Sequence, residues 1–290
     1  MTLIERQLAR TSPDYPARLR GESWAPDPLY VCGDCDLSRP AVAVVGTRAA
    51  SRAGMIAATE LCRDLCGLGV VVISGGQTGT DAAAHAGALA AGGTTWSILA
   101  SGLDAPYPER NRPLFDAIVG AGGALISVSP AGTPPRRFAF AKRNRVLCAL
   151  ADAVVVIEGA GRSGALAIAE AARGLSRPVC ARPGSPGTEA LLASGAAIVE
   201  SAADVMAAIA GRGRRPVIDL PDPDSDEGIL LAALSATVPR ASDELGERAG
   251  VSPRRALRAL TGLELSGLAV LAGPGAYLRS RTADEIASDS

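Results

Sequence analysis

The sequence is poor in lysine, histidine and aromatic residues. Among 290 residues it has one lysine, Lys142, and one histidine, His85, and only 3% of its residues are aromatic. A single histidine, with no nucleophile or set of metal ligands evident beside it, is weak evidence for catalysis, so we predict no catalytic residue, no cofactor and no metal. The net charge of -1 and the pI near 6.0 argue against a general cationic coat, although a local basic groove remains compatible with them.

Long apolar runs are also missing. No stretch is long enough to span a membrane, and the N-terminal sequence MTLIERQLARTSPDYP has no apolar signal core. We therefore expect a cytoplasmic protein with no membrane partner, whose six cysteines do not form a disulfide framework. Cys32-Gly-Asp-Cys35 is a lone CxxC pair. Cys62 and Cys66, one helical turn apart, offer a second pair of zinc ligands, but ordinary reduced thiols are the favoured interpretation.

The sequence does contain a regular alternation of short apolar runs and alanine-rich segments of helical length. The apolar runs are continuous and rich in β-branched residues, as expected of strands buried on both faces. This alternation predicts an α/β fold with a doubly wound, mostly parallel sheet. The predicted strands are residues 41–45, 69–73, 94–99, 124–128, 153–157, 178–181 and 196–199.

One stretch, VVISGGQTGTDAAAHAGALAA from Val71, joins a buried strand, a glycine-rich loop and a helix that Asp81 or the preceding threonine caps. The free N–H groups of that helix face the loop of Ser74, Gly75 and Gly79, where a phosphate would bind well. A tight turn that needs glycine only for packing explains the loop equally well. Loops after parallel strands share one sheet edge, where ligands bind. The first such loop, GTRAAS, lacks the GxGxxG fingerprint, which argues against an NAD site.

Composition predicts how the chain divides into domains. Residues 1–40 are irregular and rich in proline, and we expect them to form an arm that packs on the core. The sheet domain spans residues 41–210. Residues 211–226 are charged and rich in proline, which is typical of a linker. Residues 227–282 form a small C-terminal domain, and residues 283–290 form a tail.

The small domain has the pattern of a winged helix. Three short helices are predicted near 228–234, 241–249 and 252–262, followed by two strands around a Gly-Pro-Gly turn. Winged helices often bind duplex DNA through the third helix, which here carries Arg254, Arg255 and Arg258. A dimerisation or docking module fits the mild charge equally well.

Residues 136–145, RRFAFAKRNR, are strongly basic. Five of these ten residues are basic, none is acidic, and Phe138 and Phe140 are two of the three phenylalanines in the chain. Basic side chains neutralise phosphates and aromatic rings stack on bases, a combination that suits single-stranded nucleic acid better than a mononucleotide. A solvated cationic loop anchored by its phenylalanines is the alternative, and the residues alone slightly favour it.

The order of short motifs along the chain is specific although each motif is modest. These are Tyr15-Pro16, Leu29-Tyr30 with Gly33, Val45-Gly46-Thr47-Arg48, Ser74-Gly75 with Gly79 and Asp81, Ala84-His85, Tyr107-Pro108 with Asn111, Phe140 with Arg143-Asn144-Arg145, Val156-Ile157-Glu158 with Ser163-Gly164, and Pro183-Gly184. In this order the motifs resemble those of the DNA processing protein A family (DprA, also called Smf). The tail from Leu263 to Arg279 resembles the family's C-terminal winged helix, so the match covers nearly the whole chain.

This resemblance implies an extended Rossmann-like domain that binds single-stranded DNA and forms a homodimer, without catalysis. It further implies a recombination mediator that helps load the RecA recombinase on incoming DNA in natural transformation. Carried over by position, the DNA-binding residues are Gly46, Thr47, Arg48, Ser74, Gly75, Gly79, Phe140, Lys142, Arg143, Arg145, Ser163 and Gly164.

The chain is a divergent member by this comparison. Gln77 and Thr78 replace an alanine and an arginine of the family pattern, which removes one cation from the Ser74 loop, and further departures are Val128, Ile168 and Glu189. The Ser74 loop also resembles that of cofactor-carrier proteins with the same fold. The alternative function is therefore a nucleotide- or cofactor-binding protein of the same Rossmann-like superfamily.

Overall fold

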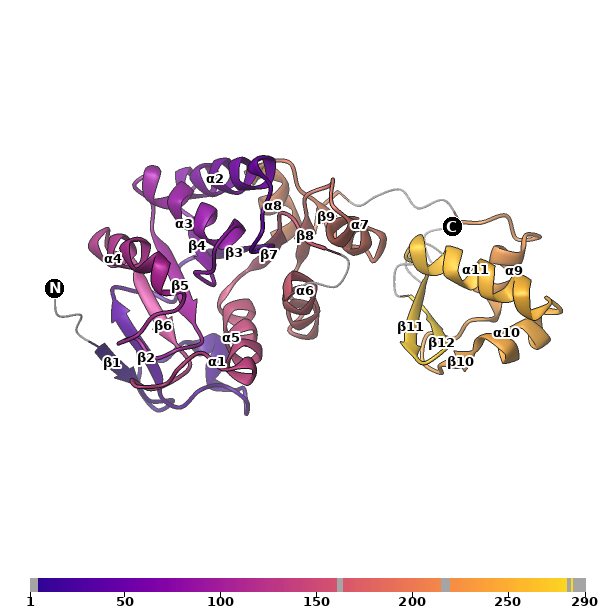
Figure 1. The fold of residues 1–290 in the computed structure, drawn as a ribbon, viewed down its shortest axis with the longest axis horizontal. Helices are drawn as coiled ribbons and strands as arrows, with labels where there is room; N and C mark the ends of the chain where they lie inside the picture. Colours follow the sequence, from indigo (N-terminus) through magenta and orange to yellow (C-terminus); the bar gives the residue numbers. More distant parts are fainter. Residues whose placement is uncertain (1–4, 161–163, 215–219, 281–282, 284–290) are drawn as a thin grey trace. The chain divides into compact units, whose positions relative to one another are not determined.

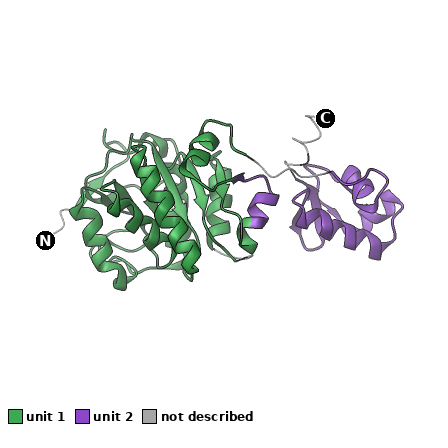
Figure 2. Cartoon of the chain, turned by 90° about the horizontal axis from the view of Figure 1, so that it is seen from above, with its two compact units in different colours: residues 1–188, 198–214 green, residues 189–197, 215–290 purple. Residues whose placement is uncertain are grey.

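The computed structural model describes residues 5–160, 164–214, 220–280 and 283. The chain forms two compact units, of which residues 1–188 with 198–214 make the larger and residues 189–197 with 215–290 the smaller (Figure 2). Ser163 lies outside the described residues. The domain bounds given above from composition stay a prediction.

The larger unit is built on one mixed sheet. Its described strands lie in the order β1-β2-β6-β5-β4-β3-β7-β8-β9 (Figure 1). The pairs β3–β4, β4–β5, β5–β6, β3–β7 and β7–β8 are parallel, which confirms the predicted doubly wound sheet. The strands are β1 (Glu5–Leu8), β2 (Leu29–Gly33), β3 (Ala41–Val45), β4 (Val71–Ser74), β5 (Thr95–Leu99), β6 (Ala124–Ser127), β7 (Ala153–Val156), β8 (Val179–Ala181) and β9 (Ala197–Ile198).

Helices cover both faces of this sheet (Figure 1). On one face α2 packs beside α3 and α8, and α3 packs beside α4; on the other, α5 packs beside α1 and α6. The helices are α1 (Ala17–Arg20), α2 (Arg52–Gly67), α3 (Thr80–Ala90), α4 (Arg112–Gly120), α5 (Arg137–Leu150), α6 (Gly164–Gly174), α7 (Pro186–Ala193) and α8 (Ala202–Ile209), with a 3-10 turn, η1 (Glu109–Asn111), before α4.

Strand β3 is the pivot of the topology. The chain moves outward from β3 through β4, β5 and β6, then returns to place β7 on the other side of β3. All five residues of β3 are buried, as expected for a central strand between two helical layers. In doubly wound sheets the ligand crevice opens where the strand order reverses, outside the carboxyl ends of the strands. That position here is beside the loops that follow β3 and β7.

The N-terminal segment is not an irregular arm, which corrects the expectation for residues 1–40. Its strand β2 pairs antiparallel with β6, and β1 pairs antiparallel with β2, so the segment extends the sheet. The apolar run of β2 is short, and its backbone groups find partners on both sides, in β1 and in the otherwise free edge of β6. Arg18 of α1 also forms an ion pair with Asp152 and donates to the Leu150 carbonyl oxygen at 2.9 Å, which ties the segment to the end of α5.

The basic stretch is helical, so it is not the loop that the alternative interpretation assumed, and whether its phenylalanines anchor the stretch or bind DNA stays a prediction. Residues Arg137–Leu150 form α5, whose last five residues are all buried. Alanine, leucine, lysine and arginine have high helix propensity, and the apolar second half gives the helix a face to pack on the sheet. Spacing along a helix then separates neighbouring basic residues onto different sides.

The smaller unit contains a winged helix, as predicted. Helices α9 (Asp226–Ala233), α10 (Ser242–Ala249) and α11 (Pro253–Leu265) enclose a core with Leu230, Leu245, Leu260 and Leu263. The wing consists of β11 (Ala269–Gly273) and β12 (Ala276–Arg279), and a short strand missed by the sequence interpretation, β10 (Arg240–Ala241), pairs with β12. Of the three arginines on α11, Arg255 is held by Asp226 through hydrogen bonds of 2.7 and 2.6 Å.

Within the described residues, no helix is both long and apolar enough to cross a membrane. The same part of the chain contains no group of three histidine, cysteine, aspartate or glutamate side chains that could hold a metal ion. All six cysteines are free thiols.

His85 is fully buried on α3, where its Nδ1 lies 2.7 Å from Oγ1 of Thr95 on β5. The Thr95 hydroxyl donates to the Val72 carbonyl oxygen at 2.7 Å, so the imidazole must be the donor to Oγ1. Nε2 is then unprotonated, and it is buried with no hydrogen-bond partner. The histidine is therefore part of the core that joins α3 to β4 and β5.

We predict that His85 makes folding sensitive to acid. Burial lowers the pKa of His85 from 6.5 to about 3. The folded state disfavours the second proton, so stability present above about pH 6.5 is lost as the pH falls toward about 3. In urea unfolding, the free energy of unfolding of wild type minus that of His85→Gln should fall by at most about 1.4 kcal/mol per pH unit in that window. A difference that stays constant between about pH 7 and about pH 4 would contradict this assignment.

Candidate nucleic-acid interface

The loops after β3 and β4 pack directly on each other at the carboxyl edge of the sheet. The Thr80 N–H and hydroxyl donate to the Thr47 carbonyl oxygen at 3.2 and 3.3 Å. A side chain at Gly46 would overlap Thr80. One at Gly79, whose φ is +76°, would overlap the carbonyl oxygens of Thr47 and Arg48. Gly46 and Gly79 are thus required for the close approach of the two loops.

Glu158, just after β7, fixes the loop that carries Arg48. Its carbonyl oxygen accepts from the Thr47 N–H at 2.9 Å, and its carboxylate accepts from the Ser51 hydroxyl at 2.8 Å. The Ser51 N–H also donates to this carboxylate, at 3.0 Å, while the Ser51 oxygen caps α2 by accepting from the Gly54 N–H. The Arg48 side chain remains exposed on this anchored loop.

The Ser74 loop is held from inside the protein. Ser74 is fully buried, and its hydroxyl donates to the Val44 carbonyl oxygen at 2.7 Å, so this side chain faces the core. The Asn111 side chain donates to the Gly76 carbonyl oxygen at 2.8 Å. Asp81 does not cap α3 as expected: its carboxylate accepts from the Gln77 N–H at 3.2 Å, and Gly79 is the N-cap without a side-chain cap. These hydrogen bonds therefore hold the loop against neighbouring parts of the protein.

Arg143 lies over this loop and is only 4% exposed. A side chain at Gly75 would overlap its guanidinium, so Gly75 makes room for the arginine. The Nε and Nη1 atoms of Arg143 are buried without a hydrogen-bond partner. Burial lowers the pKa of Arg143 and raises that of buried Asp81, and the attraction between the two charges opposes both shifts. Arginine stays charged at neutral pH despite such a shift, so Arg143 is a buried cation with unused donors.

Phe140 joins the two arginines. The guanidinium carbons of Arg48 and Arg143 each lie 5.6 Å from the centroid of the half-buried Phe140 ring, within the range of cation–π attraction. The Tyr107 ring meets Phe140 edge to face, with centroids 6.5 Å apart and 77° between the planes. Residues from α5 and from the loops after β3 and β5 thus form one cluster, which we call the Phe140 cluster: Arg48, Tyr107, Phe140 and Arg143. It offers positive charge, aromatic surface and unused N–H donors, as an anionic chain of bases requires.

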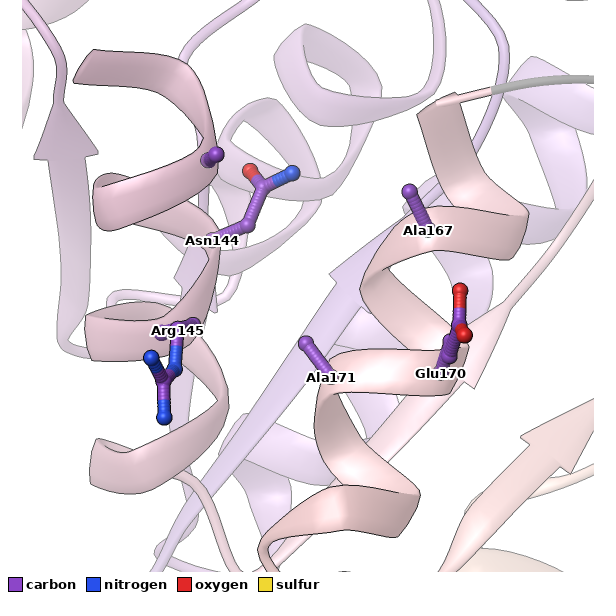
Figure 3. Close-up of a pocket in the computed structure, with 6 residues that line it drawn as sticks. Asn144, Arg145, Ala167, Glu170 and Ala171 are labelled. Carbon is purple, nitrogen blue, oxygen red and sulfur yellow. The ribbon is translucent and has the colours of Figure 1, made fainter. Parts of the chain in front are cut away.

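Other predicted residues lie elsewhere on α5 and α6. Arg145 stacks on Trp24 with its guanidinium carbon 4.3 Å from the ring centroid, and it lines a pocket between α5 and α6 (Figure 3). Asn144, Ala167, Glu170 and Ala171 line the same pocket. Lys142 is half-buried, and no ion pair or ring contact joins it to the Phe140 cluster within the described residues. Gly164, exposed at the start of α6, has open space where a side chain would begin.

Sequence reasoning missed three residues that shape this site. Tyr107 and Glu158 belong to the motifs of the family resemblance without an assigned role, and Asp81 is assigned only as a possible helix cap. The motif order was a usable signal for them, because each follows a strand at the ligand edge. For Gln77 the sequence indicated only a departure from the family pattern in the Ser74 loop. Its side chain donates to the Tyr107 carbonyl oxygen at 3.4 Å, which links the Ser74 loop to the Phe140 cluster.

Two family models match the chain. The model described as DNA recombination-mediator protein A matches residues 6–210, and that of the DprA winged helix domain matches residues 216–275. Among relatives, the putative DNA processing protein DprA of Mycobacterium tuberculosis (strain H37Rv) is 37% identical over 268 residues, 87% of this chain and 69% of that protein. Protein Smf of Escherichia coli (strain K12) is 33% identical over 285 residues, 93% of this chain and 76% of that protein.

Solved structures agree with these matches. DNA processing protein A from Streptococcus pneumoniae aligns with a TM-score of 0.65 at 35% identity, over 71% of this chain and 74% of that chain. DNA processing protein A from Helicobacter pylori, studied for its single-stranded DNA binding mode, aligns with a TM-score of 0.65 at 27% identity, over 73% of this chain and 99% of that chain. Because both family models match, and because relatives above 30% identity are covered over more than two thirds of their length, the chain belongs to the DprA/Smf family of DNA recombination-mediator proteins.

Proposed function

We propose that the chain binds single-stranded DNA at the carboxyl edge of its sheet, through the Phe140 cluster, and acts as a recombination mediator. The observation that carries this proposal is the pair of guanidinium groups at 5.6 Å from one phenylalanine ring, with two nitrogens of Arg143 buried and unpaired. The single-stranded DNA binding described for the Helicobacter pylori relative supports it.

The two arginines have different tasks in this proposal. Arg48 is exposed on an anchored loop, so it meets the phosphate backbone as a charged donor. Arg143 is buried, and a DNA group that reaches it satisfies donors that otherwise have no partner. Phe140 orders both guanidiniums, and this contact reduces the side-chain freedom that binding must otherwise remove.

The finer parts of the proposal come from the family resemblance. They are loading of the RecA recombinase on incoming DNA in natural transformation, assembly as a homodimer, a cytoplasmic location and the absence of catalysis. Nucleotide or cofactor binding at the Ser74 loop is the competing function. The Ser74 hydroxyl and the Gln77 N–H are both engaged within the protein, which leaves that loop fewer groups for a small ligand.

The first test compares oligonucleotide with nucleotide. We expect a ~20-mer of deoxythymidine to bind with micromolar or tighter affinity and with a steep negative slope of log affinity against log salt, because several phosphates are neutralised. Thymidine monophosphate should bind far more weakly. Fluorescence anisotropy over a series of salt concentrations measures both. Affinity that is independent of salt, or tighter binding of the nucleotide, would favour the competing function.

A second prediction concerns Arg48. Arg48→Ala should weaken binding of the oligonucleotide by about 1–3 kcal/mol and reduce the salt slope by about one unit, since one phosphate contact is lost. Arg63→Ala on α2 is the matched control, because that arginine is exposed and pairs with the neighbouring Asp64 at 3.2 Å. Equal effects of the two substitutions would mean that Arg48 contributes only general charge.

The third prediction separates Phe140 from Phe138. Phe140→Ala should weaken binding by about 1–3 kcal/mol and also lower the salt slope, because Arg48 and Arg143 lose their common contact. Phe138, on the same helix and 67% exposed, is the control, and Phe138→Ala should change neither quantity. If Phe140→Ala lowers the melting temperature sharply while the folded fraction binds normally, Phe140 is a core anchor and not part of the interface.

A further inference from the structure

Tyr107 has an exposed aromatic ring, and the contacts described above give this ring no separate role in binding DNA. Its side chain is 41% exposed, whereas Phe140 is half-buried and has two guanidinium groups in cation–π range. A base that stacked on Phe140 would have to compete with an arginine for the ring. Tyr107 touches Phe140 edge to face, an arrangement in which Phe140 covers at most one face of the tyrosine ring and leaves the other face clear.

The backbone holds Tyr107 in place. Its N–H donates to the Ser101 hydroxyl at 3.2 Å, and its carbonyl oxygen accepts from the Gln77 side chain at 3.4 Å. Prolines on both sides, Pro106 and Pro108, are buried and restrict the chain before and after the ring. An exposed aromatic side chain on so constrained a segment loses little conformational freedom when it binds a ligand.

We propose that Tyr107 forms a separate nucleobase-stacking subsite, so that the bound strand runs from Arg48, past Arg143, toward the loop after β5. This inference rests on the proposed single-stranded DNA binding and adds the place and direction of base contact. Stacking on an aromatic face accepts every base, so the subsite takes any nucleobase of the strand. Phe140 then acts on the DNA through the arginines, and Tyr107 acts on it directly.

Gln77 gains a role from this subsite. The family pattern has an alanine and an arginine where Gln77 and Thr78 stand, so a cation is missing from the Ser74 loop. The Gln77 side chain spans from that loop to the Tyr107 backbone. Gln77 is therefore a positioning residue for the tyrosine ring.

The direct experiment uses the full chain with a fluorescent ring at the subsite. In Tyr107→Trp, saturating deoxythymidine 20-mer should quench the added indole emission, because a stacked base lies against it. Phe138→Trp is the matched control, since Phe138 is also exposed and lies outside the Phe140 cluster, and its added emission should not change. Wild type, with Trp24 and Trp96, supplies the background.

Affinity and salt dependence give the second readout. Tyr107→Ala should raise the dissociation constant about 5- to 100-fold with the salt slope unchanged, whereas Tyr107→Phe should stay within about threefold of wild type. Gln77→Ala should raise the constant by a smaller factor, also without a change in slope.

The outcomes separate this inference from the proposed function. If neither wild type nor any variant binds the oligonucleotide, the proposed function fails. If wild type binds with the expected salt slope, but the added emission of Tyr107→Trp is not quenched and Tyr107→Ala binds normally, only the stacking subsite is overturned. A Tyr107→Ala variant with a reduced salt slope would also overturn it, because the ring would then act through the arginines as Phe140 does.

Discussion

The burial of the Arg143 guanidinium is the constraint on which the rest of the site depends. An arginine side chain at 4% exposure is costly unless charge and hydrogen bonds compensate. Gly75 provides the space, buried Asp81 provides an opposing charge, and the Phe140 ring provides a favourable surface. The compensation is incomplete, since two nitrogens have no partner.

The same constraint explains why the glycines of the site lie where they do. Gly46 and Gly79 allow the loops after β3 and β4 to make contact. This contact places the Arg48 guanidinium beside the Phe140 ring, which the Arg143 guanidinium also contacts. Glu158 and Ser51 then hold the Arg48 loop against the start of α2. These glycines matter because a side chain at either position would overlap the facing loop. They bring side chains from separate loops close to one another.

The N-terminal segment contributes from the opposite end of α5. Arg18 pairs with Asp152, whose other oxygen accepts from the Ala41 N–H at 2.9 Å, so α1, the end of α5 and the start of β3 are joined at one place. Trp24 holds Arg145, whereas Arg143 meets the Phe140 ring. Helix α5 is thus fixed at its C-terminal end, while its first turns carry Phe140 and Arg143.

The sequence by itself determined the fold class and the winged helix, because continuous apolar runs and the spacing of helices and turns are local properties of the chain. It also indicated which loops follow the parallel strands and so share one sheet edge. It also singled out Arg48, Phe140 and Arg143. It left residues 136–145 unassigned between a DNA-binding strip and a loop, although the helix propensity of residues 137–150 is a local property. It could not determine that Arg145 faces Trp24 or that Ser74 points into the core, since these follow from which side of an element meets its neighbours. The partnership of Arg48, Tyr107, Phe140 and Arg143 was decided only by the tertiary structure. These residues come from loops and a helix far apart in sequence, and only the reversal of strand order at β3 brings them to one place.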